Sequence, residues 1–161
     1  MDMNLSHYQH WTQEEMDRLH RFVSYSQASE FAMEKLKRLP QPVVQVCGPL
    51  TTGGRGSFQA NVQMMHQGIC LLVTQGKVIF DQRPFEVPMF KVLQSRKNSG
   101  YDHSLLEEFY LPLFESGLIK EFHFLPGWQS STGAKWEHKQ ACKLKIDIFY
   151  ISELMLQEVK S

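Results

Sequence analysis

The chain has 161 residues, of which 42% are hydrophobic and 21% charged, a composition typical of a globular domain and not of a disordered segment. Its 17 basic and 17 acidic residues balance, which argues against a nucleic-acid polymer or an anionic membrane as the main partner, and its apolar runs are too short to cross a bilayer. Three widely spaced cysteines, Cys47, Cys70 and Cys142, indicate neither a disulfide framework nor a metal site.

The N-terminal region is expected to be helical. Residues 1–10 are polar and lack a signal-peptide core, so we expect a cytoplasmic protein. Thr12 followed by Glu15 predicts a capping box that opens a helical stretch reaching about Arg38. The apolar pattern blurs along this stretch, so it could hold one helix or two. The sequence therefore predicts an N-terminal helical extension over residues 1–40.

The next stretch changes from helical periodicity to a β-branched run. Val43–Cys47 predicts a strand, the glycine-rich residues 48–57 a loop, and the one-sided apolar spacing of Phe58–Thr74 a helix. Residues 78–81 predict the next strand. A strand, glycine loop, helix and strand form a βαβ unit, which favours a parallel pair with a right-handed crossover.

The second half repeats this order after a helical insertion. The expected elements are a short helix (87–93), an exposed polar loop (95–102), a helix that Pro112 shortens or kinks (105–114), a strand (122–125), a second glycine loop (126–133), a helix (134–144) and a final buried strand (146–150). We predict a Rossmann-like or flavodoxin-like α/β fold, with an open, mostly parallel sheet flanked by helices in one compact domain over 41–161. Ligands of such sheets bind beyond the carboxyl ends of the strands, so both glycine loops should face one crevice.

The first glycine loop carries groups that suit an anion. It is not a Walker A loop, because Gly54 and Arg55 stand where that motif has Lys and Ser or Thr. Backbone amides, two hydroxyls, one cation and the positive end of the following helix could nevertheless hold a phosphate. The same glycines also suit a plain strand-to-helix turn with Arg55 in solvent, and the residues alone leave both interpretations open. The candidate phosphate ligands are Gly48, Thr51, Thr52, Gly53, Gly54 and Arg55.

Glu137 interrupts an apolar helical stripe that is formed by Ala134, Ala141 and Leu144. A carboxylate on such a face is costly to desolvate, and the helix N-terminus offsets only about 0.3–1 kcal/mol of that cost. A carboxylate that lies against a packed face near a ligand crevice is a candidate catalytic group. Alternatively, the first helical turn extends beyond the sheet and leaves Glu137 in water, and periodicity does not decide between these two arrangements.

A longer motif surrounds Glu137. The segment LPGWQSSTGAKWE, residues 125–137, resembles the nucleophile segment of the nucleoside 2-deoxyribosyltransferase superfamily. Its sequence is most similar to that of a poorly characterised branch. Residues 46–51 resemble the first-strand signature of that superfamily, and residues 53–55 resemble the G-G-R of deoxynucleoside 5′-monophosphate N-glycosidases. Asn61 fits a recurrent Asn on the first helix. The resemblance covers roughly residues 43–150.

The resemblance implies a chemistry for Glu137 that needs no cofactor and no metal. Glu137 would attack the anomeric carbon of a nucleoside or nucleotide, form a glycosyl-enzyme ester and release the base, and water or a second base would resolve the ester. Ser131 stands where the nucleoside transferases have an Asp that contacts the sugar and the monophosphate hydrolases have a Ser that contacts phosphate. A hydroxyl can donate to phosphate oxygens, so Ser131 and Arg55 favour a 5′-monophosphate. Ser131 could also cap the helix of Glu137, or do both.

The chain departs from the family pattern at two positions that bear on catalysis. Gln45 stands where the family has a Tyr on the first strand. A second carboxylate usually precedes the nucleophile by about two dozen residues, and direct counting reaches Leu113 instead. Glu108 or Asp102 could take that role, and Asp102 with His103 would form a reasonable acid/base pair.

Three further residues complete the predicted site. Asp81 could contact a ribose or cap a turn, Trp128 could stack on a base or anchor the packing, and Gly133 belongs to the second glycine loop. The prediction is an N-glycosidase or deoxyribosyltransferase acting on nucleoside 5′-monophosphates. The alternatives are a non-catalytic nucleotide-binding domain and a purely structural interaction domain. The resemblance implies a homodimer or a larger homo-oligomer.

Overall fold

The computed structural model describes residues 10–96 and 103–159, which form two compact units. The helical unit comprises Met1–Leu39 and Asp81–Gly117, and the sheet unit comprises Pro40–Phe80 and Leu118–Ser161. In this division Asp81–Gly117 groups with the N-terminal helices.

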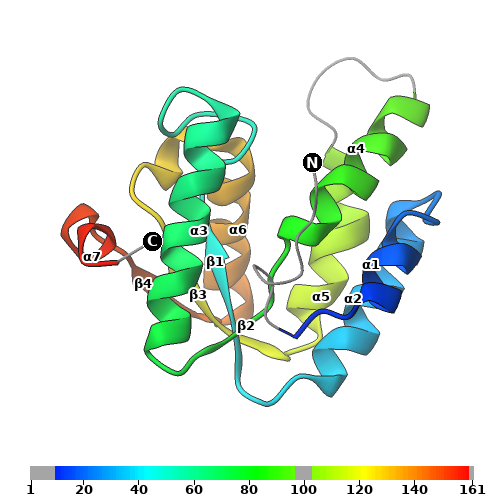
Figure 1. The fold of residues 1–161 in the computed structure, drawn as a ribbon, viewed down its shortest axis with the longest axis horizontal. Coiled ribbons are helices and arrows are strands. Elements are labelled where there is room, and N and C mark those ends of the chain that lie inside the picture. The colour runs from blue at the N-terminus through cyan, green and yellow to red at the C-terminus, as the bar shows by residue number, and fades with distance from the viewer. Residues whose placement is uncertain (1–9, 97–102, 160–161) are drawn as a thin grey trace. The chain divides into compact units, whose positions relative to one another are not determined.

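The helical unit is built from short helices (Figure 1). The Thr12–Glu15 capping box is confirmed, and the N-terminal stretch divides into two helices. The predicted helix over 105–114 begins as a π-helical segment, and Pro112, which has no N–H to donate, lies in the first turn of the α-helix that follows. The elements are α1 Gln13–Leu19, α2 Tyr25–Arg38, the 3₁₀ turn η2 Arg83–Phe85, α4 Glu86–Ser95, the π-helical η3 Leu105–Tyr110 and α5 Leu111–Glu115.

Aromatic side chains hold the helical unit together. The ring of Phe85 lies 5.5 Å from that of Trp11, 6.2 Å from that of Phe31 and 5.0 Å from that of Phe109, measured between ring centroids. All four side chains are buried. Large aromatic rings in such contacts dominate the energy of a small core. These contacts are the physical reason why the segment after β2 belongs with the N-terminal helices.

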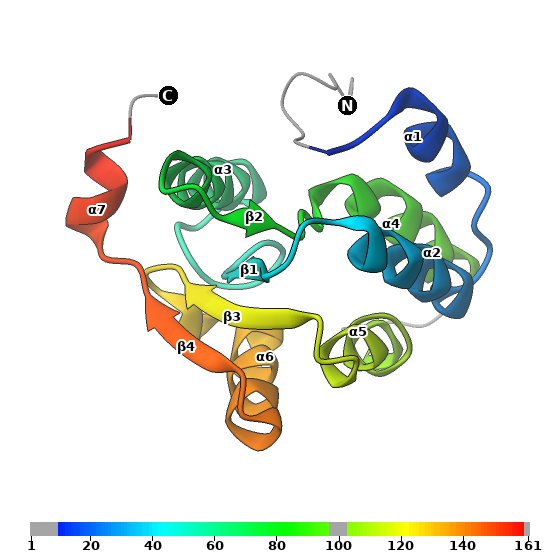
Figure 2. The same cartoon turned by 90° about the horizontal axis from the view of Figure 1, so that it is seen from below.

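The sheet unit contains a four-stranded parallel sheet with the order β2-β1-β3-β4, which confirms the predicted α/β class. Figure 2 shows α3 on one face of this sheet and α6 on the other. No helix of the described residues has both the length and the apolar character that a membrane span requires. The elements are β1 Val43–Cys47, α3 Phe58–Thr74, β2 Val78–Ile79, β3 Ile119–Phe124, the 3₁₀ turn η4 Trp128–Ser130, α6 Thr132–Leu144, β4 Asp147–Tyr150 and α7 Glu153–Gln157.

Strand β1 is buried on both faces and its side chains alternate between them. Val44 and Val46 belong to the apolar cluster that includes Met65 of α3. Gln45 therefore points to the opposite face, which α6 covers, and its side chain bonds to that helix. The polar side chain of Gln45 thus points from a valine-rich strand toward α6.

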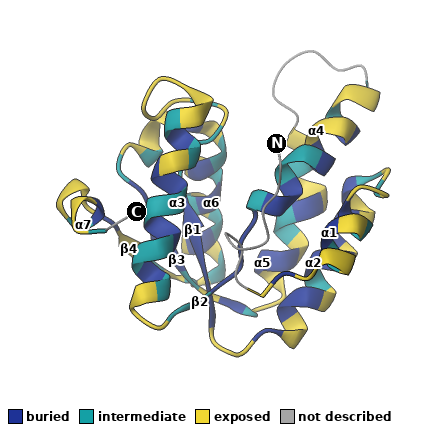
Figure 3. Ribbon diagram, viewed as in Figure 1, coloured by how far each residue is buried: buried dark blue, intermediate teal, exposed yellow. Residues whose placement is uncertain are grey.

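Strand β4 is more exposed than the sequence predicted. The sequence predicted a final buried strand over 146–150, but Phe149 is 45% exposed and Tyr150 is 58% exposed. By contrast, Figure 3 shows the central strand β1 as buried. The strand order puts β4 at the edge of the sheet, beside β3 only. An apolar run does not reveal whether its strand will lie at the centre or at the edge of a sheet.

Candidate active site

The two glycine loops meet at the carboxyl edge of the sheet, as the sequence predicted. They follow β1 and β3, which are adjacent parallel strands with Cys47 beside Phe124. The backbone N–H of Gly54 donates to Ser130 Oγ over 2.7 Å, and that of Thr132 donates to Thr52 Oγ1 over 3.2 Å. The strand order reverses between these two strands, which is where open α/β sheets bind ligands.

Close packing explains why two positions of the first loop are occupied by glycine. Gly53 and Gly54 have φ angles of 67° and 74°, a region that favours glycine. A Cβ atom on Gly53 would lie 2.2 Å from the carbonyl oxygen of Ser130, and one on Gly54 would lie 2.3 Å from Asn61 Oδ1. Gly53 therefore lets the two loops touch, whereas Gly54 lets the first loop pack against Asn61 of α3. This accounts for them structurally, whether or not the loop also binds an anion.

Asn61 of α3 holds the first loop in its conformation. Its Nδ2 donates to the carbonyl oxygens of Leu50 and Gly53, each over 3.0 Å. Its Oδ1 accepts the backbone N–H of Arg55 over 2.8 Å. The side chain is buried, so these bonds are shielded from water. The loop is thus pre-organised by one residue of the helix that follows it.

Glu137 lies against the sheet and is only 8% exposed, so the solvent-exposed alternative is wrong. It extends from α6 toward β1, where Gln45 Nε2 donates to its Oε2 over 2.7 Å. The buried thiol of Cys47 lies on the same face of β1, with its Sγ 3.9 Å from Gln45 Nε2. The three side chains form one buried polar cluster at the carboxyl end of β1.

Burial dominates the electrostatics of this cluster. It raises the pKa of Glu137 to about 8, although hydrogen bonds from Cys47 and Gln45 lower it. Burial, followed by the nearby Glu137, also raises the pKa of the Cys47 thiol. In the free protein at neutral pH Glu137 is therefore mainly a neutral carboxylic acid. In the described structure the buried Oε1 of Gln45 has no hydrogen-bond partner.

Ser131 caps the helix that carries Glu137. Its Oγ accepts the backbone N–H of Ala134 over 3.2 Å, and Ser131 itself is buried. The capping role is therefore confirmed. Gly133 lies in the first turn of α6, close to the junction of the two loops. A contact between Ser131 and phosphate stays a prediction.

The guanidinium group of Arg55 contacts two other side chains of the protein. Its Nη2 lies 2.7 Å from Glu153 Oε2 at the start of α7, and its Nε lies 3.2 Å from Met64 Sδ. The side chains of Arg55 and Glu153 are 41% and 58% exposed, so this ion pair is open to water. A pair of this kind contributes little to stability and can exchange partners.

Three predicted residues belong to the helical unit or lie outside the described residues. Asp81 accepts from the backbone N–H and the guanidinium of Arg83, with a 2.6 Å contact to Nη2, which matches the turn-capping alternative. Glu108 pairs with Arg96 over 2.8 Å. Asp102 lies outside the described residues.

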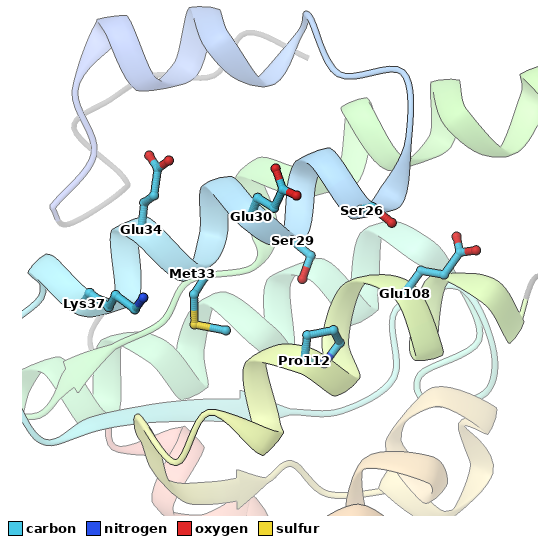
Figure 4. Close-up of a pocket in the computed structure, with 8 residues that line it drawn as sticks. All are labelled: Ser26, Ser29, Glu30, Met33, Glu34, Lys37, Glu108 and Pro112. Atoms are coloured by element: carbon cyan, nitrogen blue, oxygen red, sulfur yellow. The ribbon is translucent and has the colours of Figure 1, made fainter.

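Glu108 also lines a hollow of about 530 Å³ between α2 and the segment over η3 and α5 (Figure 4). Ser29 of the facing helix α2 donates to the carbonyl oxygen of Phe109 over 2.9 Å. The hollow belongs to the helical unit alone. Its lining residues are Ser26, Ser29, Glu30, Met33, Glu34, Lys37, Glu108 and Pro112.

Sequence reasoning missed parts of the chemistry that the structure reveals. Gln45 stood out only as a departure from a family pattern, yet it is the hydrogen-bond donor to Glu137. Its position in an apolar strand was the available signal, because a polar residue there needs a buried partner. Glu86 of α4 was also missed; burial raises its pKa to about 7.

No family model, curated protein or solved structure matches this chain. Within the described residues no group of three or more His, Cys, Asp or Glu side chains could hold a metal ion. What the geometry supplies is a buried carboxyl group with one amide donor, two joined glycine loops and the capped N-terminus of α6. Such a set can act by nucleophilic or acid/base chemistry on a small ligand.

Proposed function

We propose that the protein cleaves the N-glycosidic bond of nucleoside 5′-monophosphates, or transfers their sugar to a second base, through Glu137. The observation that supports this most is the hydrogen bond between Gln45 and Glu137, which holds a buried carboxyl group beside two joined glycine loops. A buried carboxyl group with a strongly raised pKa, at the ligand-binding edge of a parallel sheet, is typical of a catalytic group.

The proposed reaction begins with the carboxylate form of Glu137. One oxygen bonds to the anomeric carbon while the bond to the base nitrogen breaks, and the base leaves with that electron pair and takes up a proton from the solvent. Water then hydrolyses the glycosyl ester, or a second base displaces it. The transition state carries positive charge on the sugar, and a desolvated anion interacts with such charge more strongly than an anion in water.

The phosphate is proposed to lie where the two loops join. Thr51 is exposed beside Thr52, and the N-terminus of α6 with Gly133 and Ser131 is on the facing loop. Backbone amides and a helix N-terminus favour an anion together. Arg55 would break its ion pair with Glu153 and bind the phosphate instead.

Base release from a panel of nucleoside and deoxynucleoside monophosphates tests the proposal. Purified protein should liberate free base, detected by chromatography, and Glu137→Gln should remove that activity because the amide is not a nucleophile. Glu158→Gln, which makes the same chemical change at an exposed residue, should keep full activity. The proposal is wrong if no substrate releases base, or if Glu137→Gln is as active as the control.

A non-catalytic nucleotide-binding domain is the second candidate. The observation that favours it is that the neutral Glu137 is already hydrogen-bonded inside the protein, as a structural polar residue would be. Nucleotides would then raise the melting temperature without releasing base, and Glu137→Gln would not change the size of that rise. Calorimetry of both proteins with the same panel separates the two candidates.

A further inference from the structure

A second hollow lies in the sheet unit, at the carboxyl ends of β3 and β4. Its volume is about 400 Å³, within the range of roughly 300–1,000 Å³ that small-molecule sites occupy. It lies at the same edge of the sheet as the glycine loops, because η4 and its neighbours belong to the second loop. The lining residues are Phe124, Leu125, Pro126, Gly127, Trp128, Gln129, Tyr150 and Ile151.

Two flat aromatic rings form part of this lining. Trp128 stacks on His138, with 4.3 Å between ring centroids and planes 12° apart. His138 covers one face of the indole ring and is not among the residues that line the hollow. Tyr150, also in the lining, lies 6.3 Å from Trp128 with its ring plane only 24° away, and it is 58% exposed. The hollow therefore offers nearly parallel aromatic faces.

These rings are held in place before any ligand binds. The hydroxyl of Tyr150 lies 2.7 Å from His138 Nε2. The ring of Phe124 contacts both Trp128 and His138, at centroid distances of 5.2 Å and 5.0 Å. The turn is closed by backbone bonds from Trp128 to Leu125 and from Ser130 to Gly127. A pre-formed surface loses little conformational entropy when a rigid ligand binds to it.

We propose that this hollow binds an uncharged, flat heteroaromatic ring of nucleobase size. The ring would stack on Trp128 and Tyr150, since stacking on an aromatic face is favourable for any base. The side-chain amide of Gln129, exposed at the rim, supplies both a donor and an acceptor for the polar edge of such a ring. The eight lining residues include no acidic or basic side chain, so the hollow suits the ring and not a phosphate. The proposal is based on the geometry of the hollow alone. Ligand binding there does not require the reaction that is proposed for Glu137.

Nuclear magnetic resonance with adenine as the probe tests this site. The three tryptophans give three indole N–H signals, which Trp→Phe variants assign. Adenine should shift the Trp128 signal in a saturable way and leave the signals of Trp11 and Trp136 in place. Cyclohexanol, a saturated ring without π faces, should shift none of them. The proposal is wrong if adenine leaves the Trp128 signal unchanged up to its solubility limit.

Substitutions locate the ring within the hollow. Trp128→Leu and Tyr150→Leu should each weaken adenine binding by roughly tenfold or more, because each removes a stacking face. Phe149→Leu is the matched control: it changes the neighbouring exposed aromatic residue, which stacks on His123 on the other face of the sheet. It should leave the affinity unchanged, and an equal loss in this control would overturn the proposal.

One further variant keeps the test decisive. Gln129→Ala changes an exposed residue, so weaker adenine binding in this variant supports the site even if Trp128→Leu does not fold. Adenine binding without base release from the monophosphates would support this site and reject the proposed reaction. Base release without adenine binding would support the reaction and overturn this site.

Discussion

Gln45 Nε2 and Glu137 Oε2 lie 2.7 Å apart, although 92 positions separate the two residues in the chain. The bond joins the first strand of the sheet to the helix after the second glycine loop. A buried carboxyl group without a partner is costly, and Gln45 supplies a donor to Glu137 at this point.

Replacing Gln45 tests what this bond contributes. Gln45→Leu should destabilise the protein by about 1–3 kcal/mol, because it leaves a buried carboxyl group without its amide donor. Urea denaturation measures the change. In the background of Glu137→Leu the same substitution should cost much less, and equal costs in both backgrounds would show that the two side chains are not coupled.

The pKa of Glu137 predicts how stability depends on pH. Burial raises that pKa from 4.5 to about 8, so between these values the folded protein binds a proton that the unfolded chain has lost. The contribution of Glu137 to stability is therefore greatest below about pH 4.5 and declines as the pH rises toward 8. Glu137→Gln should remove this decline, so the variant should gain stability relative to the unaltered protein as the pH increases. Parallel denaturation curves at pH 5, 7 and 9 check the sign, and a constant difference would contradict it.

The same pKa predicts a rate profile for the proposed reaction. Only the carboxylate form of Glu137 is a nucleophile, so kcat/KM for base release should rise with pH and level off above about 8. Gln45→Leu should move this rise to higher pH, because the amide bond lowers the pKa of Glu137. Initial rates across this range, measured with one monophosphate, provide the comparison. A profile that falls between pH 6 and 8 would contradict the assigned role of Glu137.

The contact between the glycine loops predicts different effects for two glycines. Gly53→Ala should destabilise the protein by more than about 1 kcal/mol, because its Cβ would lie 2.2 Å from a backbone oxygen of Ser130. Gly56 also has a positive φ, 89°, but a Cβ there would meet nothing within 4 Å. Gly56→Ala therefore reports backbone strain alone. Melting temperatures of the two variants should differ clearly, and equal losses would show that the loops do not pack as described.

The ion pair between Arg55 and Glu153 predicts a change in affinity with little change in stability. Glu153→Gln should alter stability by less than about 1 kcal/mol, because both side chains are exposed. It should also lower the KM for a nucleoside monophosphate several-fold, since Arg55 would no longer have to leave a carboxylate. The KM for the corresponding nucleoside should stay the same. An equal change for both substrates would mean that Arg55 does not meet the phosphate.

Much of the local structure could be predicted from the sequence. The Thr12 capping box, strand β1 and helix α3 were all predicted at their observed positions. Each depends on interactions between residues a few positions apart, such as caps, β-branched runs and helical periodicity. The parallel order of strands followed from the βαβ pattern, and with it the meeting of the two glycine loops.

The tertiary structure decided the features that depend on distant partners. Periodicity identified Glu137 as unusual, but only the fold showed that it is buried and that Gln45 is its partner. Likewise, the exposure of β4 depends on its place at the sheet edge, and the grouping of Asp81–Gly117 with the N-terminal helices depends on ring contacts such as that between Trp11 and Phe85. A local pattern determines which segments form helices and strands, whereas burial and pairing arise from contacts between segments that are far apart in the chain.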